Sequence, residues 1–260
     1  MFETLELEVD PGGIARLTLS RADKHNAMSG QMIAELKQAA AELGANKAVR
    51  AVLLSGAGDS FCAGADLGWM RAQMVAQPEV RFSEARALAE MLQAFNNLPK
   101  PLIGAIQGNA FGGGIGLISV CDMAIGADHV KMALTETRLG LIPATIGPYV
   151  IARMGASRAR RVVMSGRVIK AREAVDLGLL ARVVPAGDLV EVVEAELTSY
   201  LKCAPGAVAA AKAMIHALAP PITDAIIDQS IAALVAGWET DEAKEGIAAF
   251  FDKRKPNWAR

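Results

Sequence analysis

The sequence predicts an α/β core followed by a helical C-terminal region. In the first half, uninterrupted apolar runs of strand length alternate with polar, periodic stretches of helix length. Strands that are apolar on both faces imply a sheet covered by helices on both sides. After about residue 185 only helical patterns follow. We therefore expect a loose boundary near residue 190, with an α/β core over residues 1–190 and a helical part over residues 191–260.

The first elements are a strand, a helix and a second strand. Ile14–Leu19 is a short run of β-forming residues, and Ser29 is of a type that caps helix N-termini. The helix that follows carries its apolar residues on one face: Ile33, Leu36, Ala40 and Leu43. Ala51–Leu54 is then a continuous apolar run, which predicts a buried strand.

The later elements follow the same logic. A short helical stretch covers residues 67–75, a polar periodic helix covers residues 79–98 and stops before Pro99, and residues 102–106 form another buried strand. The glycine cluster Gly108–Gly116 comes next and leads into a helix at residues 115–120. The C-terminal helices are expected at Leu189–Leu201, Gly206–Leu218, Ile222–Trp238 and Asp241–Phe251. Their apolar faces could complete the core or pack against a second copy of the chain, and we expect self-association.

Composition excludes several classes of protein. The 260 residues are 52% hydrophobic and 21% charged, as in globular proteins, and the net charge of −1 gives no reason to expect nucleic acid or an anionic membrane as a partner. No apolar run reaches the roughly 20 residues of a membrane span, and the N-terminus has no leader pattern, so we expect a soluble, cytoplasmic protein. The three cysteines are far apart, which disfavours a zinc site or disulfides and suggests three small buried side chains.

Two turns rich in small residues each follow a predicted strand. The segment 61–67 (FCAGADL) precedes the helix at 67–75, and the segment 109–114 (NAFGGG) precedes the helix at 115–120. Small residues allow close approach to the backbone, and a helix start directs free N–H groups at the turn. Together the two turns could form a two-donor oxyanion hole. Each turn alone could equally reflect tight packing, and neither matches a dinucleotide or phosphate-loop pattern.

Glu136 is the candidate acid/base residue. It lies between the apolar runs 132–134 and 139–142, where few charged residues are expected. Desolvation of a carboxylate in apolar surroundings raises its proton affinity, which suits general acid/base catalysis. A structural ion pair with Arg138, or a surface turn, would explain the same pattern. The histidines and serines match no triad or nucleophile elbow, so a serine hydrolase is not expected.

Three segments together resemble the enoyl-CoA hydratase/isomerase (crotonase) superfamily. They are FCAGADL at 61–67, GNAFGGGIGLISVCDMAIGA at 108–127 and LTETRLGLIP at 134–143. The similarity extends from RADKHNAMS at 21–29 to FFDKRKPNW at 250–258, so it covers nearly the whole chain. The order and spacing of the segments are specific, although no single segment is.

The resemblance implies a fold, a site and a mode of assembly. The fold would be a crotonase-like spiral of β-β-α units with a C-terminal helical trimerisation region, assembled as a trimer or a dimer of trimers. Ala65 and Gly113 match the two oxyanion donors, and Glu136 matches a catalytic glutamate. Coenzyme A would arrive as part of the acyl-CoA thioester substrate, so no separate cofactor is implied. The residues that match its binding positions are Lys24, Cys62, Ala63, Asp66, Phe250 and Lys253.

One departure from the family pattern concerns the reaction. Hydratases with two carboxylates have a glutamate where this chain has Gly116. A single glutamate is typical of Δ3,Δ2-enoyl-CoA isomerases, which move one proton between two carbons. Glu84 or Glu90 could replace the missing carboxylate if folding brings it close. A non-catalytic acyl-CoA-binding or RNA-associated homologue is a third reading.

Other segments favour hydration of a branched or carboxylated acyl group. DLGWMR at 66–71 and LTETRLGLIPATIGPYVIARMG at 134–155 are similar to bacterial methylglutaconyl-CoA hydratases, in which that first glutamate is also often absent. This resemblance implies a role in leucine catabolism. Arg71 or Arg138 could pair with a distal carboxylate, or both could be solvated surface residues. The predicted acyl pocket consists of Trp69, Met70, Arg71, Gly116 and Arg138.

Overall fold

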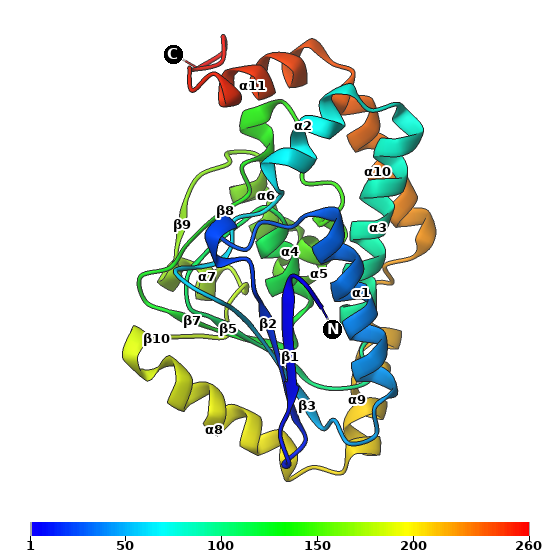
Figure 1. Ribbon diagram of the computed structural model, residues 1–260, viewed down its shortest axis with the longest axis vertical. Coiled ribbons are helices and arrows are strands. Elements are labelled where there is room, and N and C mark those ends of the chain that lie inside the picture. Colours follow the sequence, from blue (N-terminus) through cyan, green and yellow to red (C-terminus); the bar gives the residue numbers. More distant parts are fainter. Residues whose placement is uncertain (1, 260) are drawn as a thin grey trace.

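A six-stranded sheet forms the centre of the molecule in the computed structural model, which describes residues 2–259 (Figure 1). Its strand order is β1-β2-β3-β5-β7-β10, with β1 and β2 antiparallel and all other neighbours parallel. The strands are β1 (Leu5–Val9), β2 (Ile14–Leu19), β3 (Ala51–Gly56), β5 (Leu102–Ile106), β7 (Met123–Ala127) and β10 (Arg182–Val184).

A second, four-stranded sheet has the order β4-β6-β8-β9. Its strands are short: β4 (Ser60–Cys62), β6 (Asn109–Phe111), β8 (Lys131–Ala133) and β9 (Ile169–Lys170). The chain passes from the large sheet to the small one three times, from β3 to β4, from β5 to β6 and from β7 to β8, and helical segments follow each pass. This is the spiral of β-β-α units that the resemblance implies, and the prediction is confirmed.

Eleven α-helices and three short 3₁₀ helices lie around the sheets within the described residues. The α-helices are α1 (Gly30–Ala45), α2 (Leu67–Val75), α3 (Pro78–Asn96), α4 (Gly113–Val120), α5 (Gly147–Met154), α6 (Ala156–Val163), α7 (Ala171–Asp176), α8 (Leu189–Leu201), α9 (Pro205–Leu218), α10 (Asp224–Trp238) and α11 (Asp241–Phe251). The 3₁₀ helices are η1 (Ala22–Lys24), η2 (Glu136–Leu139) and η3 (Ala186–Asp188). Each α-helix of residues 2–259 is either too short or too polar to span a bilayer.

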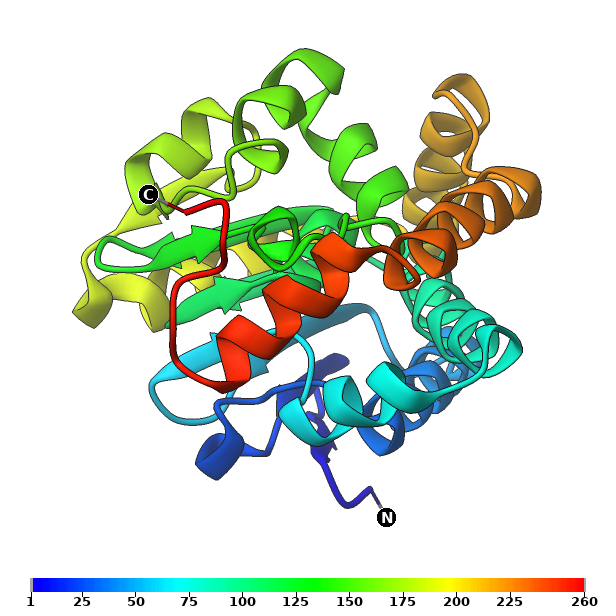
Figure 2. The ribbon, with the colours of Figure 1, turned by 90° about the horizontal axis from the view of Figure 1, so that it is seen from above.

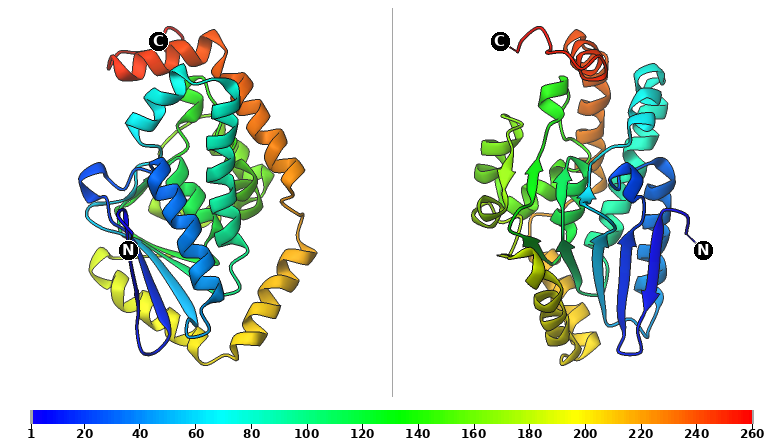
Figure 3. Two further views of the ribbon diagram at one scale, coloured as in Figure 1. Left: turned by 45° about the vertical axis from the view of Figure 1, so that its right-hand side comes forward. Right: turned by 60° about the vertical axis from the view of Figure 1, so that its left-hand side comes forward.

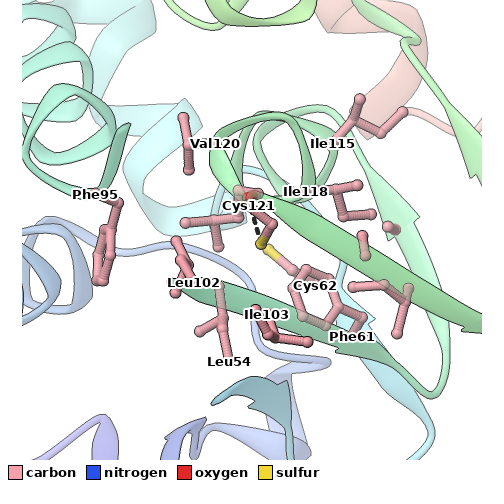
Figure 4. Close-up of a cluster of buried hydrophobic side chains, with 14 of the residues drawn as sticks. Leu54, Phe61, Cys62, Phe95, Leu102, Ile103, Ile115, Ile118, Val120 and Cys121 are labelled. Carbon is pink, nitrogen blue, oxygen red and sulfur yellow. Dashed lines mark hydrogen bonds between the residues drawn. The ribbon is translucent and has the colours of Figure 1, made fainter. Parts of the chain in front are cut away.

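The core lies between the large sheet and its helices. The hydroxyl of Ser29 accepts a hydrogen bond from the N–H of Met32 (3.2 Å), which caps α1 as predicted. Helices α1 and α3 run side by side (Figure 3), and α8 packs against β3, β5 and β7. Beneath α4, the side chains of Phe61, Cys62 and Cys121 pack closely with Leu102 and Ile103 of β5 (Figure 4).

The three cysteines do not share one environment. Cys62 and Cys121 are buried, and burial raises the pKa of each thiol to about 12, so both act as small apolar side chains. Cys203 is exposed at the end of α8, which corrects the expectation that all three are buried.

The C-terminal helices begin and end within two residues of their predicted positions. α8 starts at the predicted boundary near residue 190, yet its Leu189, Val193 and Leu197 are buried in the main core. In contrast, α9 has no buried residue. The division of the chain at residue 190 stays a prediction.

Candidate active site

A cavity of about 440 Å³ is lined by residues of α2, η2, α10 and α11, among others. Helices α2, α10 and α11 come together at the end of the molecule that is uppermost in Figure 1, and Figure 2 shows the same end from above. The turn 63–65 and the segment 111–113 form its inner wall, and α2, α3, η2 and α10 supply apolar side chains. Phe250 of α11 lies at its edge and is 46% exposed. Among the described residues, the only charged side chains that line the cavity are those of Glu136 and Arg138.

Glu136 is the first residue of η2, directly after β8 and its connecting residues. Gly140 ends η2 with φ of 72°, a left-handed conformation that favours glycine. A β-carbon at Gly140 would lie 2.5 Å from the carbonyl of Glu242, and one at Gly246 would lie 2.5 Å from the carbonyl of Leu139. The backbones of η2 and α11 therefore touch, and this contact holds the segment that carries Glu136.

One oxygen of the Glu136 carboxylate is unsatisfied. Its Oε2 is fully buried and has no hydrogen-bond partner within residues 2–259. Burial raises the pKa of Glu136 from 4.5 to about 7, and its own backbone N–H offsets this only in part. Arg138 makes no ion pair with Glu136 in the described part of the chain, so the structure contradicts the ion-pair alternative.

Two backbone N–H groups near this carboxylate are also free. Neither Ala65 nor Gly113 donates its N–H to a partner among the residues that the structure describes. Gly113 is the first residue of α4, where an N–H has no intrahelical acceptor. A β-carbon at Gly112 would lie 3.1 Å from Oε1 of Glu136 and 3.9 Å from Cα of Gly64. The two turns and the carboxylate therefore converge, as an oxyanion hole beside an acid/base residue requires.

Gly116 is enclosed instead of lining the cavity. A β-carbon there would lie 2.6 Å from Cγ2 of Ile146 and 3.4 Å from Cδ1 of Leu92. The space next to Gly116 is thus filled by apolar side chains, which differs from its predicted place in the acyl pocket.

Neither predicted substitute carboxylate reaches the cavity. Glu84 accepts a hydrogen bond from the indole N–H of Trp69 (3.0 Å), and Glu90 pairs with Lys37 and Arg86. In the described part of the chain, Glu136 is the only carboxylate that lines the site.

The other predicted acyl-pocket residues divide into two groups. Trp69, Met70 and Arg138 line the cavity. Arg71 does not, because its guanidinium lies over the ring of Phe251, 4.7 Å from the centroid. Arg71 and Arg138 were both candidates to pair with a carboxylate at the far end of the acyl group, and of the two only Arg138 lines the cavity.

The predicted CoA-binding residues are also divided. Ala63 and Phe250 line the cavity, and Phe250 comes from the same chain. Asp66 caps α2 through Gly68 and Trp69, and Cys62 lies in the core. Lys24 and Lys253 are exposed outside the cavity wall. The structure brings no CoA to these residues, so their role in binding it stays a prediction.

Several cavity residues were not predicted. Met28, Ile33 and Leu88 come from the first half of the chain, and Leu234 and Trp238 come from α10. Met28 lies in the quoted segment 21–29, but nothing in its local sequence marks a site residue. The two α10 residues read as ordinary apolar positions of a helix.

Comparison with known proteins gives a consistent result over the full chain. Residues 10–260 match the family model described as enoyl-CoA hydratase/isomerase. The "Probable enoyl-CoA hydratase EchA17" of Mycobacterium bovis is 38% identical over 212 residues, which cover 80% of each chain. A crystal structure of an enoyl-CoA hydratase from Shewanella pealeana is 34% identical with a TM-score of 0.82, covering 99% of this chain and 97% of that one. One from Mycobacterium avium is 30% identical with a TM-score of 0.86 and full coverage of both chains.

Proposed function

Because this chain belongs to the enoyl-CoA hydratase/isomerase family, we propose that it adds water to the double bond of a 2-enoyl-CoA and catalyses the reverse dehydration. The observation that supports this most directly is the buried, unpartnered Glu136 carboxylate beside two free backbone N–H groups. Such a group can exchange a proton near neutral pH, and the two donors can hold an oxyanion.

One glutamate is sufficient for the proton balance of the reaction. Ionised Glu136 takes a proton from water as the oxygen bonds to C3 of the substrate. The electron pair of the double bond moves through C2 to the thioester oxygen, and the resulting enolate accepts hydrogen bonds from Ala65 and Gly113. Glu136 then gives its proton to C2, and the enolate collapses to the 3-hydroxyacyl thioester. With no second carboxylate in the described cavity wall, the water is held by Glu136 and backbone groups.

The acyl group proposed for this site is branched or carboxylated, as in methylglutaconyl-CoA. The cavity is lined mainly by apolar side chains, which suits a branched chain. Arg138 is the only cation lining it among residues 2–259, so a distal carboxylate would pair with Arg138.

A single-glutamate isomerase is the second candidate function. It is favoured by the enclosed Gly116, because Ile146 and Leu92 fill the space next to that position. In this reaction Glu136 would remove a proton from C2 of a 3-enoyl-CoA and return it to C4, with no water consumed.

Self-association belongs to the same proposal. Helix α9 has no buried residue, and Met214, Ile215 and Leu218 on it are 57%, 62% and 80% exposed. Apolar side chains exposed together on one helix are typical of an interface, and a second copy of the chain is the proposed partner.

Mass spectrometry in H₂¹⁸O separates the two reactions. The purified protein is incubated with 3-methylglutaconyl-CoA, crotonyl-CoA and a 3-enoyl-CoA. A labelled 3-hydroxyacyl-CoA is the expected product, and the preferred substrate identifies the acyl group. An unlabelled product of unchanged mass with a shifted double bond would establish the isomerase instead. Acyl-CoA binding without turnover of any substrate would overturn both.

A further inference from the structure

We propose that Met28 is a positioning residue that sets the spacing and direction of the two N–H donors, Ala65 and Gly113. The inference rests on the proposed function, because it assumes that these donors hold the thioester oxygen. Met28 is only 2% exposed, lies between η1 and α1, and lines the cavity. It contacts both donor segments, one through its backbone and the other through its side chain.

The backbone of Met28 holds the first turn. Its N–H donates to the carbonyl of Gly64 (2.7 Å), and its carbonyl accepts from the N–H of Asp66 (3.0 Å). These two bonds form an isolated parallel bridge between Met28 and Ala65. In a parallel bridge, one residue forms hydrogen bonds with the two neighbours of the residue opposite it. The N–H and carbonyl of that opposite residue, here Ala65, point away from the bridge. The bridge thus fixes the turn and leaves the N–H of Ala65 free.

The side chain of Met28 reaches the second donor. Its terminal methyl group occupies the space in which a β-carbon at Gly113 would stand. The methyl group therefore packs directly on the first residue of α4, whose N–H is the second donor. An unbranched thioether can thread into such a gap, and leucine, which has one fewer atom along its chain, does not reach as far.

The residues before Met28 make its backbone rigid. Asn26 is fully buried, and its Nδ2 donates to the carbonyls of Ala57 and Ser60, each at 2.8 Å. Its Oδ1 accepts from the N–H of Arg21, whose guanidinium pairs with Asp66 at 3.0 Å. Asp66, the residue that follows Ala65, is therefore linked to the same hydrogen-bond network that holds the backbone before Met28.

This arrangement makes the two donors depend on one residue, the first on the backbone of Met28 and the second on its side chain. Donors stabilise an enolate only when they lie about 2.7–3.1 Å from its oxygen, so a shift of a few tenths of an ångström in one of them weakens the site. Shortening Met28 opens a gap at Gly113 and relaxes the distance between the donors. Binding of the CoA portion should change little, because the hydrogen bonds of Met28 to Gly64 and Asp66 come from its backbone and do not need its side chain.

The experiment compares Met28→Leu and Met28→Ala with Met91→Leu as a matched control. Met91 is equally buried, on α3, and does not line the cavity. Three quantities are measured for each variant: thermal unfolding, kcat and KM for the preferred enoyl-CoA, and the pKa of a bound 3-ketoacyl-CoA. The last is read from the ultraviolet absorbance of its enolate and reports donor alignment without any turnover.

For Met28→Leu we expect kcat to fall about tenfold. For Met28→Ala we expect a fall of up to roughly 10²-fold, which approaches the fall in kcat caused by removing one oxyanion donor. KM should change by less than about threefold, since the lost interaction forms only in the transition state. The pKa of the bound 3-ketoacyl-CoA should rise in both variants and stay at the wild-type value in Met91→Leu.

An unchanged pKa of the bound 3-ketoacyl-CoA in a folded Met28→Leu or Met28→Ala protein would overturn the inference, as would equal losses in Met28→Leu and Met91→Leu. If Met28→Ala does not fold, the volume-conserving Met28→Leu variant still decides the question. Failure of the proposed function looks different: the wild-type protein would turn over no enoyl-CoA, whereas the enolate measurement would still test Met28.

Discussion

At the scale of single residues, the proposed activity depends on Glu136, a carboxylate with one oxygen that the fold leaves without a partner. Oε2 of Glu136 is fully buried and unbonded within residues 2–259, and the nearest cation along the chain, Arg138, does not pair with it. Burial disfavours the charged form, so the pKa of Glu136 rises to about 7. A group that titrates there is half ionised under neutral conditions and can both take and give a proton.

Replacing Glu136 with glutamine removes this proton transfer and keeps the shape of the side chain. We expect kcat to fall by roughly 10²–10⁴-fold, the usual contribution of a general acid/base. A fall of only a few-fold, measured in steady-state assays on folded Glu136→Gln protein, would exclude Glu136 as the acid/base residue.

The pH dependence of the wild-type enzyme follows from the same raised pKa. Because the reaction begins with the ionised carboxylate, kcat/KM should rise with pH and level off above about 7, the pKa of Glu136. The rise would lie near pH 4.5 if the carboxylate had its ordinary pKa. The residual activity of Glu136→Gln should lack this step.

The individual site residues were predictable to different degrees. Glu136 was singled out by a local signal, a charge between apolar runs, and small residues at helix starts indicated the two donor turns. The assignment of the donors to Ala65 and Gly113 came from the resemblance to the family. Met28 was not, because its importance comes from contacts with segments about 36 and 85 residues away, which no local pattern reports. Arg71 was misplaced for the same reason, since Phe251, the ring beneath it, is far along the chain.

At the scale of elements, the contact between η2 and α11 positions Glu136, the proposed acid/base residue. A 3₁₀ helix of four residues has little stability of its own, so neighbouring elements must hold it. Here the backbone of α11 fits against it at Gly140 and Gly246, where side chains would clash. The C-terminal helix is therefore part of the site although it contributes only Phe250 to the cavity wall.

The substitution Gly246→Ala tests this contact. Alanine favours a helix by about 1 kcal/mol over glycine, yet its β-carbon would lie 2.5 Å from the Leu139 carbonyl. We expect the clash to prevail, with a net loss of about 1–3 kcal/mol in the free energy of unfolding and a lower kcat. Chemical denaturation and steady-state kinetics measure the two effects.

Gly237→Ala in α10 is the control for that substitution. Its new β-carbon would make an ordinary contact of 3.8 Å with Leu141, so the protein should keep its activity and gain or retain stability. If both variants behave alike, the contact between η2 and α11 is not critical.

The longer elements were predictable from periodicity, and the shortest were not. The limits of α2, α8 and α11 agree with the sequence patterns, and Pro99 lies just beyond α3 as expected. Strands β4, β6, β8 and β9 have two or three residues each, too few to display an alternating pattern. β1 was missed because its sequence, LELEV, reads as acidic, although Leu5 faces the core and Glu6 faces solvent.

At the scale of the whole molecule, α9 is the one α-helix of residues 2–259 that has no buried residue. Its Met214, Ile215 and Leu218 are largely exposed, whereas α8 and α10 at its two ends both contribute to hydrophobic cores. The resemblance predicted the spiral and its helical end, and the structure confirms the spiral. The way in which copies of the chain would assemble depends on exposed surfaces such as that of α9, which are not determined by contacts within one chain.

Self-association can be tested on this surface. In analytical ultracentrifugation, we expect the wild-type protein to sediment as a multiple of its 27.3 kDa mass. The double variant Ile215→Glu, Leu218→Glu should dissociate, because each new charge would have to be buried. Val75→Glu, at a position 83% exposed on α2, should leave the mass unchanged. Wild-type sedimentation as a monomer would contradict the proposal.

The packing around Gly116 also restricts which sequences this chain can reach by single substitutions. A glutamate at that position would meet Ile146 before its side chain could extend, so the substitution alone would strain the packing and destabilise the fold by about 1–3 kcal/mol or more. Making Ile146 smaller first would open the space and cost only local packing. The order of mutations therefore matters: a lineage or a design that acquires a second carboxylate here must change residue 146 before residue 116.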